Sequence, residues 1–499
     1  METKHLQAIA QWRKAIHAIL AGVCLWALVP SASCATYYVD ASAPNDNGAG
    51  SRTSPKKYLT SGIALMSQEG GDTLILASGR YAGAKNSITP STRLRNGRAG
   101  AKGGPDAYNV VRAAIDGSVT VTGNLDLPLS SAYLQFEGIK WTAADQKNIV
   151  GHHLKFLRCA FKNGPPTGNN VSVVVGTNDQ TPGAHDILIE DSWVYGPGGR
   201  YKVLVFNSRN VVLRRVVVRH DGGWIPSNED PQAGIAIYNS PDVELQNALV
   251  IDSTLQYPGW LGAIAHVQND LRGTLENADA RVRGSIVLNI ADVGVSYEGN
   301  GSIRDAQIAN TVIWKVARSA LTLNGGSHNV RADRLTVGEV SGSSAINVFG
   351  GSASTLDVTH SILHRVAREA FRRNRGTLSE SINNCFATSG SVGCAGPGDT
   401  ALDALTNGLK FLPRVEPDSK LGEAGMGAVV TTRIGTQGTL YGEPGYDSPT
   451  GEDLWPWPNQ DRLRADFCED GVTRGLCGTP LSLTNYIWSF LGSAWPIRP

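Results

Sequence analysis

An apolar residue with the same kind of neighbours recurs along the middle of the chain at intervals of 20 to 37 residues. Two positions before it and five after it the residue is again apolar, and three after it the residue is mostly small. These anchor residues are Phe136, Phe156, Ile189, Leu213, Leu245, Val282, Ile308, Ala332 and Val358. Repetition with this period predicts a solenoid, in which each coil contacts only its neighbours.

The segments around the anchors are short and rich in β-branched residues, as in NVVLRRVVV (residues 210–218) and DVELQNALV (residues 242–250). Parallel strands that are buried on both faces have this composition. The 57 glycines and only 3 methionines also suit strands and turns better than helices. We therefore predict an all-β chain of stacked parallel coils, with the anchors in register at one per coil.

The first part of the mature chain resembles a known superfamily. Residues 37–83 (YYVDASAPNDNGAGSRTSPKKYLTSGIALMSQEGGDTLILASGRYAG) are similar to the opening of secreted right-handed parallel β-helix proteins, the pectate-lyase-like superfamily. The resemblance implies a right-handed parallel β-helix (solenoid). Within this stretch Leu59, Ile63 and Met66 have helical spacing. We expect a helix there that caps the first coil, because an open solenoid end exposes apolar core.

The N-terminus has the pattern of a secretory signal. Lys4, Arg13 and Lys14 precede an apolar run at residues 15–29, and small residues follow it. Residues 1–35 are therefore predicted to be a cleaved signal peptide of a secreted, periplasmic or extracellular protein. The alternative is an uncleaved membrane anchor, for which the run is short. No later segment is expected to span a membrane.

Two pairs of cysteines are each spaced nine residues apart, Cys385 with Cys394 and Cys468 with Cys477. This spacing predicts two local disulfides, which form in an oxidising compartment. A metal site is disfavoured because a CxxC knuckle is absent. Cys159 lies at a small position that faces inward, so we expect a buried thiol.

The chain divides into three parts after the signal. Residues 36–130 are expected to form the N-terminal cap and first coils, and residues 131–395 the coils with long loops. Residues 396–499 differ in composition and are predicted to form a small C-terminal module, mostly irregular and helical, packed on the last coils. Three tryptophans should hold it there, with a sugar-stacking platform as the alternative: Trp455, Trp457 and Trp488.

Three intervals between anchors exceed the 24 to 26 residues of a plain coil. Residues 163–185, 221–241 and 253–279 carry the excess, and all three leave the coil at the same phase. They should therefore emerge on one side of the scaffold. Long loops gathered on one side of a rigid scaffold usually build a site, whereas ornamental insertions are the alternative.

The register also pairs charged residues, because equivalent positions in neighbouring coils lie about 4.8 Å apart. Just after the anchors, Glu190 faces Arg214 and Asp191 faces Arg215. These pairs are interpreted as charge ladders on a solvated face, or else as part of a site.

Seven positions after the anchors, His220 faces Asp252 at the root of the long loops. A carboxylate that orients an imidazole is the arrangement of a general base, and a structural hydrogen bond is the alternative. The candidate catalytic residues are His220, Arg215, Arg214, Asp252 and His266. The candidate substrate-binding residues are Lys202, Arg219 and Tyr257.

Three carboxylates, Asp221, Glu229 and Asp230, lie in one of the long loops. Together with backbone oxygens they could hold Ca²⁺, although their spacing matches no ordered ligand set. The expectation is therefore no cofactor, or Ca²⁺ at these residues. The sequence contains no phosphate-binding loop and no nucleotide-binding motif.

The resemblance implies an acidic polysaccharide, which members of this superfamily commonly process by β-elimination or C5 epimerisation of uronic acids. That chemistry needs a cation beside the carboxylate and a base at the neighbouring proton. The segment EDPQAGIAIYNS is also similar to the Asp-Pro-His-Asp motif of mannuronan epimerases, but only Asp230 and Pro231 match. Gln232 replaces the expected histidine, so no catalytic residue is carried over.

We therefore expect a monomeric, secreted protein that binds and modifies an acidic, uronate-containing polysaccharide, as a lyase or epimerase. One alternative is a non-catalytic glycan-binding or cell-envelope structural β-helix protein, and the second is a glycoside hydrolase. The net charge of +1 and the 18% of charged residues argue against a nucleic-acid partner that is bound by bulk electrostatics.

Overall fold

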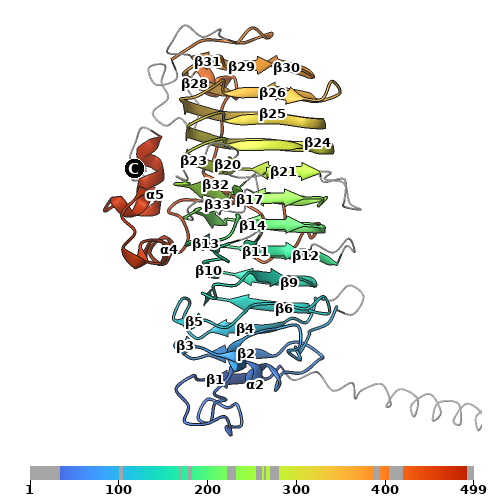
Figure 1. Ribbon diagram of the computed structural model, residues 1–499, viewed down its shortest axis with the longest axis vertical. Helices are drawn as coiled ribbons and strands as arrows, with labels where there is room; N and C mark the ends of the chain where they lie inside the picture. Colours follow the sequence, from blue (N-terminus) through green and yellow to red (C-terminus); the bar gives the residue numbers. More distant parts are fainter. Residues whose placement is uncertain are drawn as a thin grey trace, which may run out of the picture.

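The chain is a right-handed parallel β-helix, as predicted. The computed structural model describes residues 34–100, 105–167, 170–177, 183–221, 232–253, 261–262, 266–269, 280–386, 394–403 and 420–491. Within these residues, 31 strands form one sheet that rises along the long axis of the molecule (Figure 1). A right-handed crossover is the usual connection between parallel strands of one sheet, because of strand twist.

Each complete coil contributes a strand to each of three faces. The strands of the first face are β1 (Thr36–Val39), β2 (Thr73–Leu76), β4 (Asn109–Ala113), β6 (Ala132–Glu137), β9 (His152–Leu157), β12 (Ala184–Glu190), β15 (Ser208–Arg214), β18 (Val243–Gln246), β22 (Arg281–Arg283), β27 (Thr355–Thr359) and β30 (Thr377–Ser381). The strands of the second face are β3 (Gly79–Tyr81), β5 (Val119–Val121), β7 (Ile139–Trp141), β10 (Ala160–Lys162), β13 (Trp193–Tyr195), β16 (Val217–Val218), β19 (Leu249–Ile251), β23 (Ile286–Ile290), β28 (Ile362–Val366) and β31 (Asn384–Phe386).

The third face begins later in the chain. Its strands are β8 (Lys147–Ile149), β11 (Val171–Gly176), β14 (Tyr201–Phe206), β17 (Gln232–Tyr238), β20 (Leu261–Gly262), β21 (His266–Asn269), β26 (Ile346–Gly350) and β29 (Phe371–Arg373). Two long strands, β24 (Val295–Val316) and β25 (Leu321–Val340), bend around the coil and pair with strands of all three faces.

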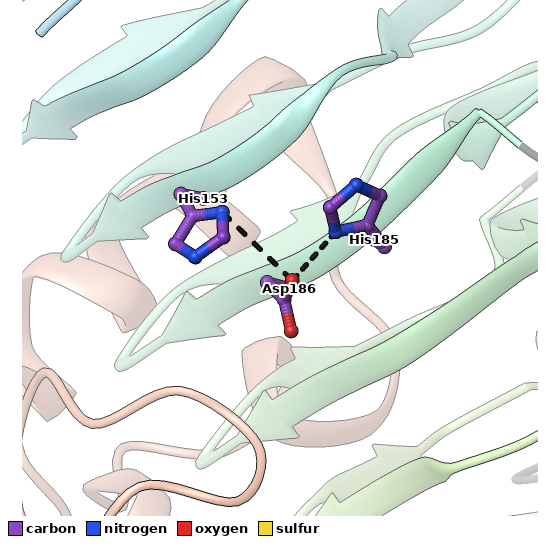
Figure 2. A group of neighbouring side chains, drawn as sticks. All are labelled: His153, His185 and Asp186. Carbon is purple, nitrogen blue, oxygen red and sulfur yellow. Dashed lines mark hydrogen bonds and ion pairs between the residues drawn. The ribbon is translucent and has the colours of Figure 1, made fainter. Parts of the chain in front are cut away.

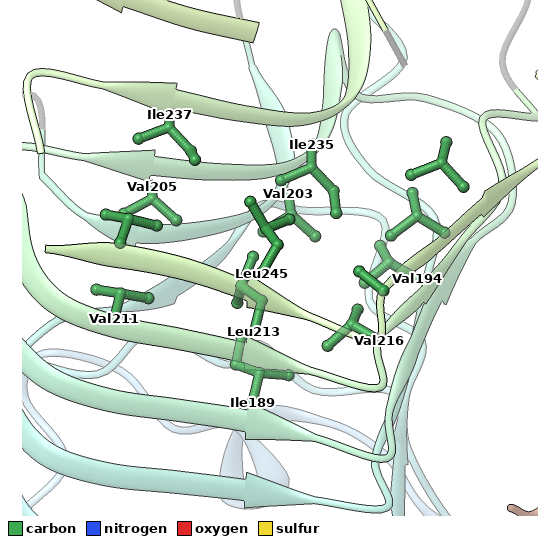
Figure 3. Close-up of a cluster of buried hydrophobic side chains, with 14 of the residues drawn as sticks. Ile189, Val194, Val203, Val205, Val211, Leu213, Val216, Ile235, Ile237 and Leu245 are labelled. Carbon is green, nitrogen blue, oxygen red and sulfur yellow. The ribbon is translucent and has the colours of Figure 1, made fainter. Parts of the chain in front are cut away.

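The predicted register of the anchors is confirmed at every step. Phe136 pairs with Phe156, Phe156 with Ile189, and so on through Ala332 and Val358. The stack continues beyond the predicted range, since Val111 pairs with Phe136 in the preceding coil. Figure 3 shows the consequence for the core, in which equivalent apolar side chains of successive coils lie one above another.

The three predicted loop ranges are not loops throughout. Each contains a strand of the third face: β11 lies within residues 163–185, β17 overlaps residues 221–241, and β20 and β21 lie within residues 253–279. That the three ranges leave the coil on one common side stays a prediction, because much of the excess chain lies outside the described residues.

A short helix is present near the N-terminus, as predicted from the spacing of its apolar residues. It is α2 (Leu59–Ile63), and Leu59, Ile63 and Met66 all belong to the buried core. That this helix caps the first coil stays a prediction. Residues 1–33 of the predicted signal peptide lie outside the described residues. None of the described helices has the length and hydropathy needed to cross a bilayer.

The C-terminal module lies mainly against the middle coils rather than on the last ones. Its elements are α3 (Lys420–Glu423), β32 (Thr432–Ile434), β33 (Pro449–Asp453), α4 (Gln460–Phe467), the 3₁₀ helices Glu469–Gly471 and Gly475–Gly478, and α5 (Leu483–Phe490). Figure 1 shows α4 and α5 beside the second face. The three tryptophans of the module are buried in one apolar cluster with residues of β13, β19 and β23, which supports docking rather than a sugar platform.

Both predicted disulfides are present, Cys385–Cys394 and Cys468–Cys477. Cys159 is a buried free thiol, as expected.

Candidate functional site

The predicted charge pairs form, but they are not on a solvated face. Arg214 Nη1 lies 3.2 Å from Glu190 Oε1, and Arg215 Nε lies 2.6 Å from Asp191 Oδ1. Arg214 and Glu190 are fully buried because residues 436–446 of the C-terminal module cover them. Arg214 donates to the backbone oxygens of Thr436 and other residues of this segment. The network therefore joins the module to the coils, and it does not face a substrate.

His220 and Asp252 do not form the predicted pair. His220 is buried, its Nε2 lies 3.1 Å from the backbone oxygen of Arg200, and no described residue forms a hydrogen bond with its Nδ1. Burial, followed by the charge of Lys202, lowers the pKa of His220 to about 3. Asp252 instead accepts hydrogen bonds from the hydroxyl of Tyr486 at 2.5 Å, from Leu476 and from Asn289.

Asp221 is also committed to structural contacts. Its carboxylate lies 2.6 Å from Arg219 Nε and 2.6 Å from Arg474 Nη2, and it accepts a hydrogen bond from the Gly196 backbone at 2.7 Å. Both of its oxygens are therefore occupied, which gives no support to Asp221 as a calcium ligand. Glu229, Asp230 and Tyr257 lie outside the described residues.

The structure does not place the last two candidates, Lys202 and His266, in an open binding or catalytic site. Lys202 is fully buried and donates to the backbone oxygens of Gly196 and Gly198, and burial lowers its pKa to about 7. His266 lies in β21, but its side chain is outside the described residues. The described candidates thus line the buried boundary between the coils and the C-terminal module.

A second group of side chains, which sequence reasoning missed, lies half-buried on the first face. It consists of His152 and His153 at the start of β9 and His185 and Asp186 in β12. Figure 2 shows three of them, His153, His185 and Asp186. His185 Nδ1 lies 2.5 Å from Asp186 Oδ2, and His153 Nδ1 lies 3.8 Å from the same oxygen. His152 Nδ1 is 3.0 Å from His153 Nδ1. Imidazoles of two coils therefore converge on one carboxylate.

The local backbone explains why neighbours in sequence lie together. His153 and Asp186 occupy equivalent positions in consecutive coils and have φ of 50° and 55°. Left-handed backbone at a single residue interrupts the alternation of side chains along a strand, so adjacent side chains can share one side. Asp and His are among the residues that adopt this conformation more readily.

Aromatic rings continue this group toward the N-terminal coils. Tyr133 stacks on His153 with ring centroids 4.5 Å apart, and Tyr108 lies edge-on to Tyr133 at 5.7 Å. Lys155 Nζ lies 4.4 Å from the centre of the Tyr108 ring. We call the whole set the histidine strip, defined as Tyr108, Tyr133, His152, His153, His185 and Asp186.

The environment of the strip favours the neutral form of two of its imidazoles, those of His152 and His153. Burial lowers the pKa of both His152 and His153, and for His152 the neighbouring His185 adds to the effect. Asp186 is held from its other side, since Asn210 Nδ2 donates to Oδ1 at 2.9 Å. No described residue occupies His185 Nε2 with a hydrogen bond. This arrangement can accept a proton or coordinate a metal ion.

The strip could have been found from the sequence. The charged pairs that the register predicts lie one, two and seven positions after the anchors. Three and four positions before the anchors Phe156 and Ile189, the same register aligns His153 with Asp186 and His152 with His185. The signal for the strip is therefore present in the sequence, at positions before the anchors rather than after them.

Two other places have site-like features. A cavity of 610 Å³ is lined by the charged residues Lys315, Glu339 and Arg365 together with small and aliphatic residues and Asn289. Glu380, Cys394 and Asp399 are also close enough to share a metal ion, but the sulfur of Cys394 is engaged in a disulfide.

Comparisons with known proteins concern this architecture only. No protein-family model and no curated protein matches the sequence. Among solved structures, the Agl-KA catalytic domain has a TM-score of 0.40 at 12% identity, covering 62% of this chain and 63% of that one. Pectate lyase Pel9A has a TM-score of 0.36 at 15% identity, covering 77% and 83%. A mannuronic acid specific polysaccharide family 6 lyase from human gut microbiota has a TM-score of 0.40 at 10% identity, covering 76% and 85%. These values do not support the transfer of an activity.

Proposed function

We propose that the chain binds an acidic, uronate-containing polysaccharide along the histidine strip and acts on it as a lyase or epimerase. The observation that carries this proposal is the half-buried His185–Asp186 pair, with its 2.5 Å contact between Nδ1 and Oδ2. A carboxylate that orients an imidazole prepares that imidazole to accept a proton from a substrate.

The strip also suits an extended chain as ligand. Tyr108, Tyr133 and His153 come from three consecutive coils, so their rings recur at about the 4.8 Å spacing of paired strands. Rings of this kind offer an apolar face and a polar edge to a ligand. A polysaccharide would therefore lie parallel to the axis of the β-helix.

Arg209 can supply the positive charge that the substrate carboxylate needs. Arg209 is exposed and is the register partner of His185 in the next coil. No hydrogen bond or ion pair from a described residue engages its guanidinium. A positive charge next to a uronate carboxylate stabilises the anion that forms when the proton on C5 is removed.

The reaction then follows from these parts. His185 accepts the C5 proton while Arg209 holds the carboxylate. In elimination, the electron pair forms the C4–C5 double bond, the bond from C4 to the glycosidic oxygen breaks, and that oxygen takes up a proton. In epimerisation, a proton returns to C5 from the opposite side.

The test is to incubate the purified chain with alginate, pectate and glycosaminoglycans and to measure the ultraviolet absorbance of unsaturated uronate. His185→Ala and Asp186→Asn should each lower the rate about 10²–10⁴-fold, the usual contribution of a general base. His360→Ala is the matched control, because His360 also contacts a carboxylate, that of Asp333 at 2.9 Å, but belongs to a different part of the first face.

Other outcomes separate the alternatives. Deuterium uptake at C5 without unsaturated product would indicate an epimerase. Retention of the polysaccharide without any product would favour the non-catalytic glycan-binding protein, and new reducing ends without unsaturation would favour a glycoside hydrolase. Full activity in Asp186→Asn would exclude the histidine strip as the site.

A further inference from the structure

The histidine strip carries the features of a metal site. His153, His185 and Asp186 each offer one ligand atom, and these three atoms all lie within 4.8 Å of one another. We propose that these three residues bind one Zn²⁺ or another first-row divalent transition-metal ion.

The distances between the ligand atoms are close to those that a metal requires. Zinc binds imidazole nitrogen and carboxylate oxygen at about 2.0–2.2 Å in tetrahedral geometry, which places neighbouring ligand atoms about 3.3–3.6 Å apart. The two contacts of Asp186 Oδ2, at 2.5 Å to His185 and 3.8 Å to His153, lie on either side of this range. Small rotations of side chains on the surface of the sheet would bring all three atoms onto one ion.

The donor set selects the class of metal. Two imidazoles and one carboxylate suit Zn²⁺, Fe²⁺ and similar ions, whereas Ca²⁺ prefers six to eight oxygen ligands. Three protein ligands leave at least one position open to water or substrate. His152, whose Nδ1 lies 3.0 Å from His153 Nδ1, is a further nitrogen at the same place.

A second layer of contacts orients the carboxylate. Asn210 donates to Asp186 Oδ1 from the next coil, which leaves Oδ2 directed at the imidazoles. Outer contacts of this kind are typical of metal sites, and their loss usually weakens metal affinity 10- to 100-fold. No lysine or arginine among the described residues forms an ion pair with Asp186.

The metal would deepen the proposed function, and this role rests on that function. An ion on the strip could accept the uronate carboxylate of a bound polysaccharide in its open position. It would then supply, together with Arg209, the positive charge that makes the C5 proton more acidic. In this metal-bound form His185 Nδ1 is a ligand and His185 Nε2 keeps its proton, so His152, the imidazole of the strip that is not a ligand, would accept the C5 proton in place of His185. Metal binding itself requires no polysaccharide and can be measured alone.

The experiment uses the tag-free, purified chain, treated with a chelator and then dialysed. Zn²⁺ is titrated by calorimetry, and Co²⁺ is followed by its visible absorption, which reports nitrogen and oxygen coordination. We expect one ion per chain, with affinity reduced at least tenfold by Asp186→Asn and by His185→Ala, and about tenfold by Asn210→Ala. His360→Ala should bind as the unmodified chain does.

Circular dichroism spectra should show that each variant keeps its strand content. His153→Gln serves as a further test, since it removes a ligand from the adjacent coil. Absence of binding, or binding that Asp186→Asn and His185→Ala leave unchanged, would overturn the metal site.

The two proposals fail separately. One ion bound at the strip without any polysaccharide product would leave the metal site in place and reject the lyase or epimerase. Activity that requires Asp186 but survives complete removal of metal would leave the lyase or epimerase in place and reject the role of the ion in its reaction, and failure to bind metal in the titration would reject the metal site itself.

Discussion

Tyr486 donates its phenolic hydroxyl to Asp252 Oδ1 at 2.5 Å, across 234 residues of sequence. Asp252 lies at a corner of the coil, and Tyr486 lies in α5 of the C-terminal module. The same carboxylate accepts a hydrogen bond from the backbone of Leu476 at 2.9 Å. Asp252 was predicted to be the partner of a catalytic base. Its carboxylate instead binds the C-terminal module to the middle coils.

Replacement of Tyr486 by phenylalanine should destabilise this attachment. The variant removes one hydrogen bond to a buried charged acceptor, and such bonds contribute about 1.5–3 kcal/mol. We expect a loss of this size in the free energy of unfolding, measured by urea denaturation with the fluorescence of the buried tryptophans of the module. Tyr37→Phe is the control, because no described residue bonds to the Tyr37 hydroxyl. Equal stability of the two variants would contradict the role of Tyr486.

Replacement of Arg215 by alanine should destabilise the fold rather than act on catalysis alone. The change leaves Glu190 and Asp191 without the guanidinium that contacts both carboxylates. Removing one partner of a buried ion pair costs about 3–5 kcal/mol, since the remaining charge stays buried. Urea denaturation should show this loss, whereas Arg209→Ala, at an exposed arginine, should change stability by less than about 0.5 kcal/mol.

His220 should make stability depend on pH. Burial lowers its pKa to about 3 in the folded chain, against the ordinary histidine value of 6.5. Between these values the unfolded chain binds a proton that the folded chain does not, so the free energy of unfolding decreases as the pH falls, by about 1.4 kcal/mol per unit. Above pH 6.5 the contribution is complete, because the imidazole is neutral in both states.

The variant His220→Gln isolates this term. Glutamine can donate to the Arg200 backbone oxygen and does not titrate, so the difference from the unmodified chain should be nearly constant above pH 6.5 and should change below it. The free energies of unfolding of His220→Gln and of the unmodified chain are compared at about pH 4 and about pH 8. If they differ by the same amount at both pH values, His220 does not titrate as described.

The fold could be predicted because a solenoid repeats one local rule. Each anchor occupies the equivalent position of its coil, as Leu213 does between Ile189 and Leu245. Periodicity in the sequence therefore predicts which residues contact one another. The same rule predicts which charged residues lie at equivalent positions of neighbouring coils. The pairing of Arg214 with Glu190 was found in this way.

The position of the C-terminal module could not be predicted by that rule. Its contacts, such as Arg214 to the Thr436 backbone and Asp252 to Tyr486, join residues more than 200 positions apart without any repeat. The sequence pattern therefore gave the neighbours of Arg214 within the coils but not its cover. The same pattern is sufficient to align His153 with Asp186, because both lie three positions before their anchors, Phe156 and Ile189.

Two glycines of the C-terminal module provide a matched test of how tightly the module packs on the coils. Gly435 and Gly438 have nearly equal φ, 79° and 77°. A Cβ on Gly435 would lie 2.4 Å from Arg214 Nε and 2.5 Å from the Tyr446 backbone oxygen, whereas a Cβ on Gly438 would meet nothing within 4 Å. The backbone strain of an alanine is therefore the same at both positions, and only the available space differs.

Gly438→Ala should cost about 1–2 kcal/mol, the penalty of left-handed backbone for a residue with a Cβ. Gly435→Ala should cost about 1–3 kcal/mol more, because the added methyl group displaces the Arg214 guanidinium from a buried network that cannot easily yield. Urea denaturation of the two variants measures the difference directly. Equal losses of stability in the two variants would mean that residues 436–446 can move away from Arg214 at little cost. The module would then be only loosely packed on the buried charged network that contains Arg214.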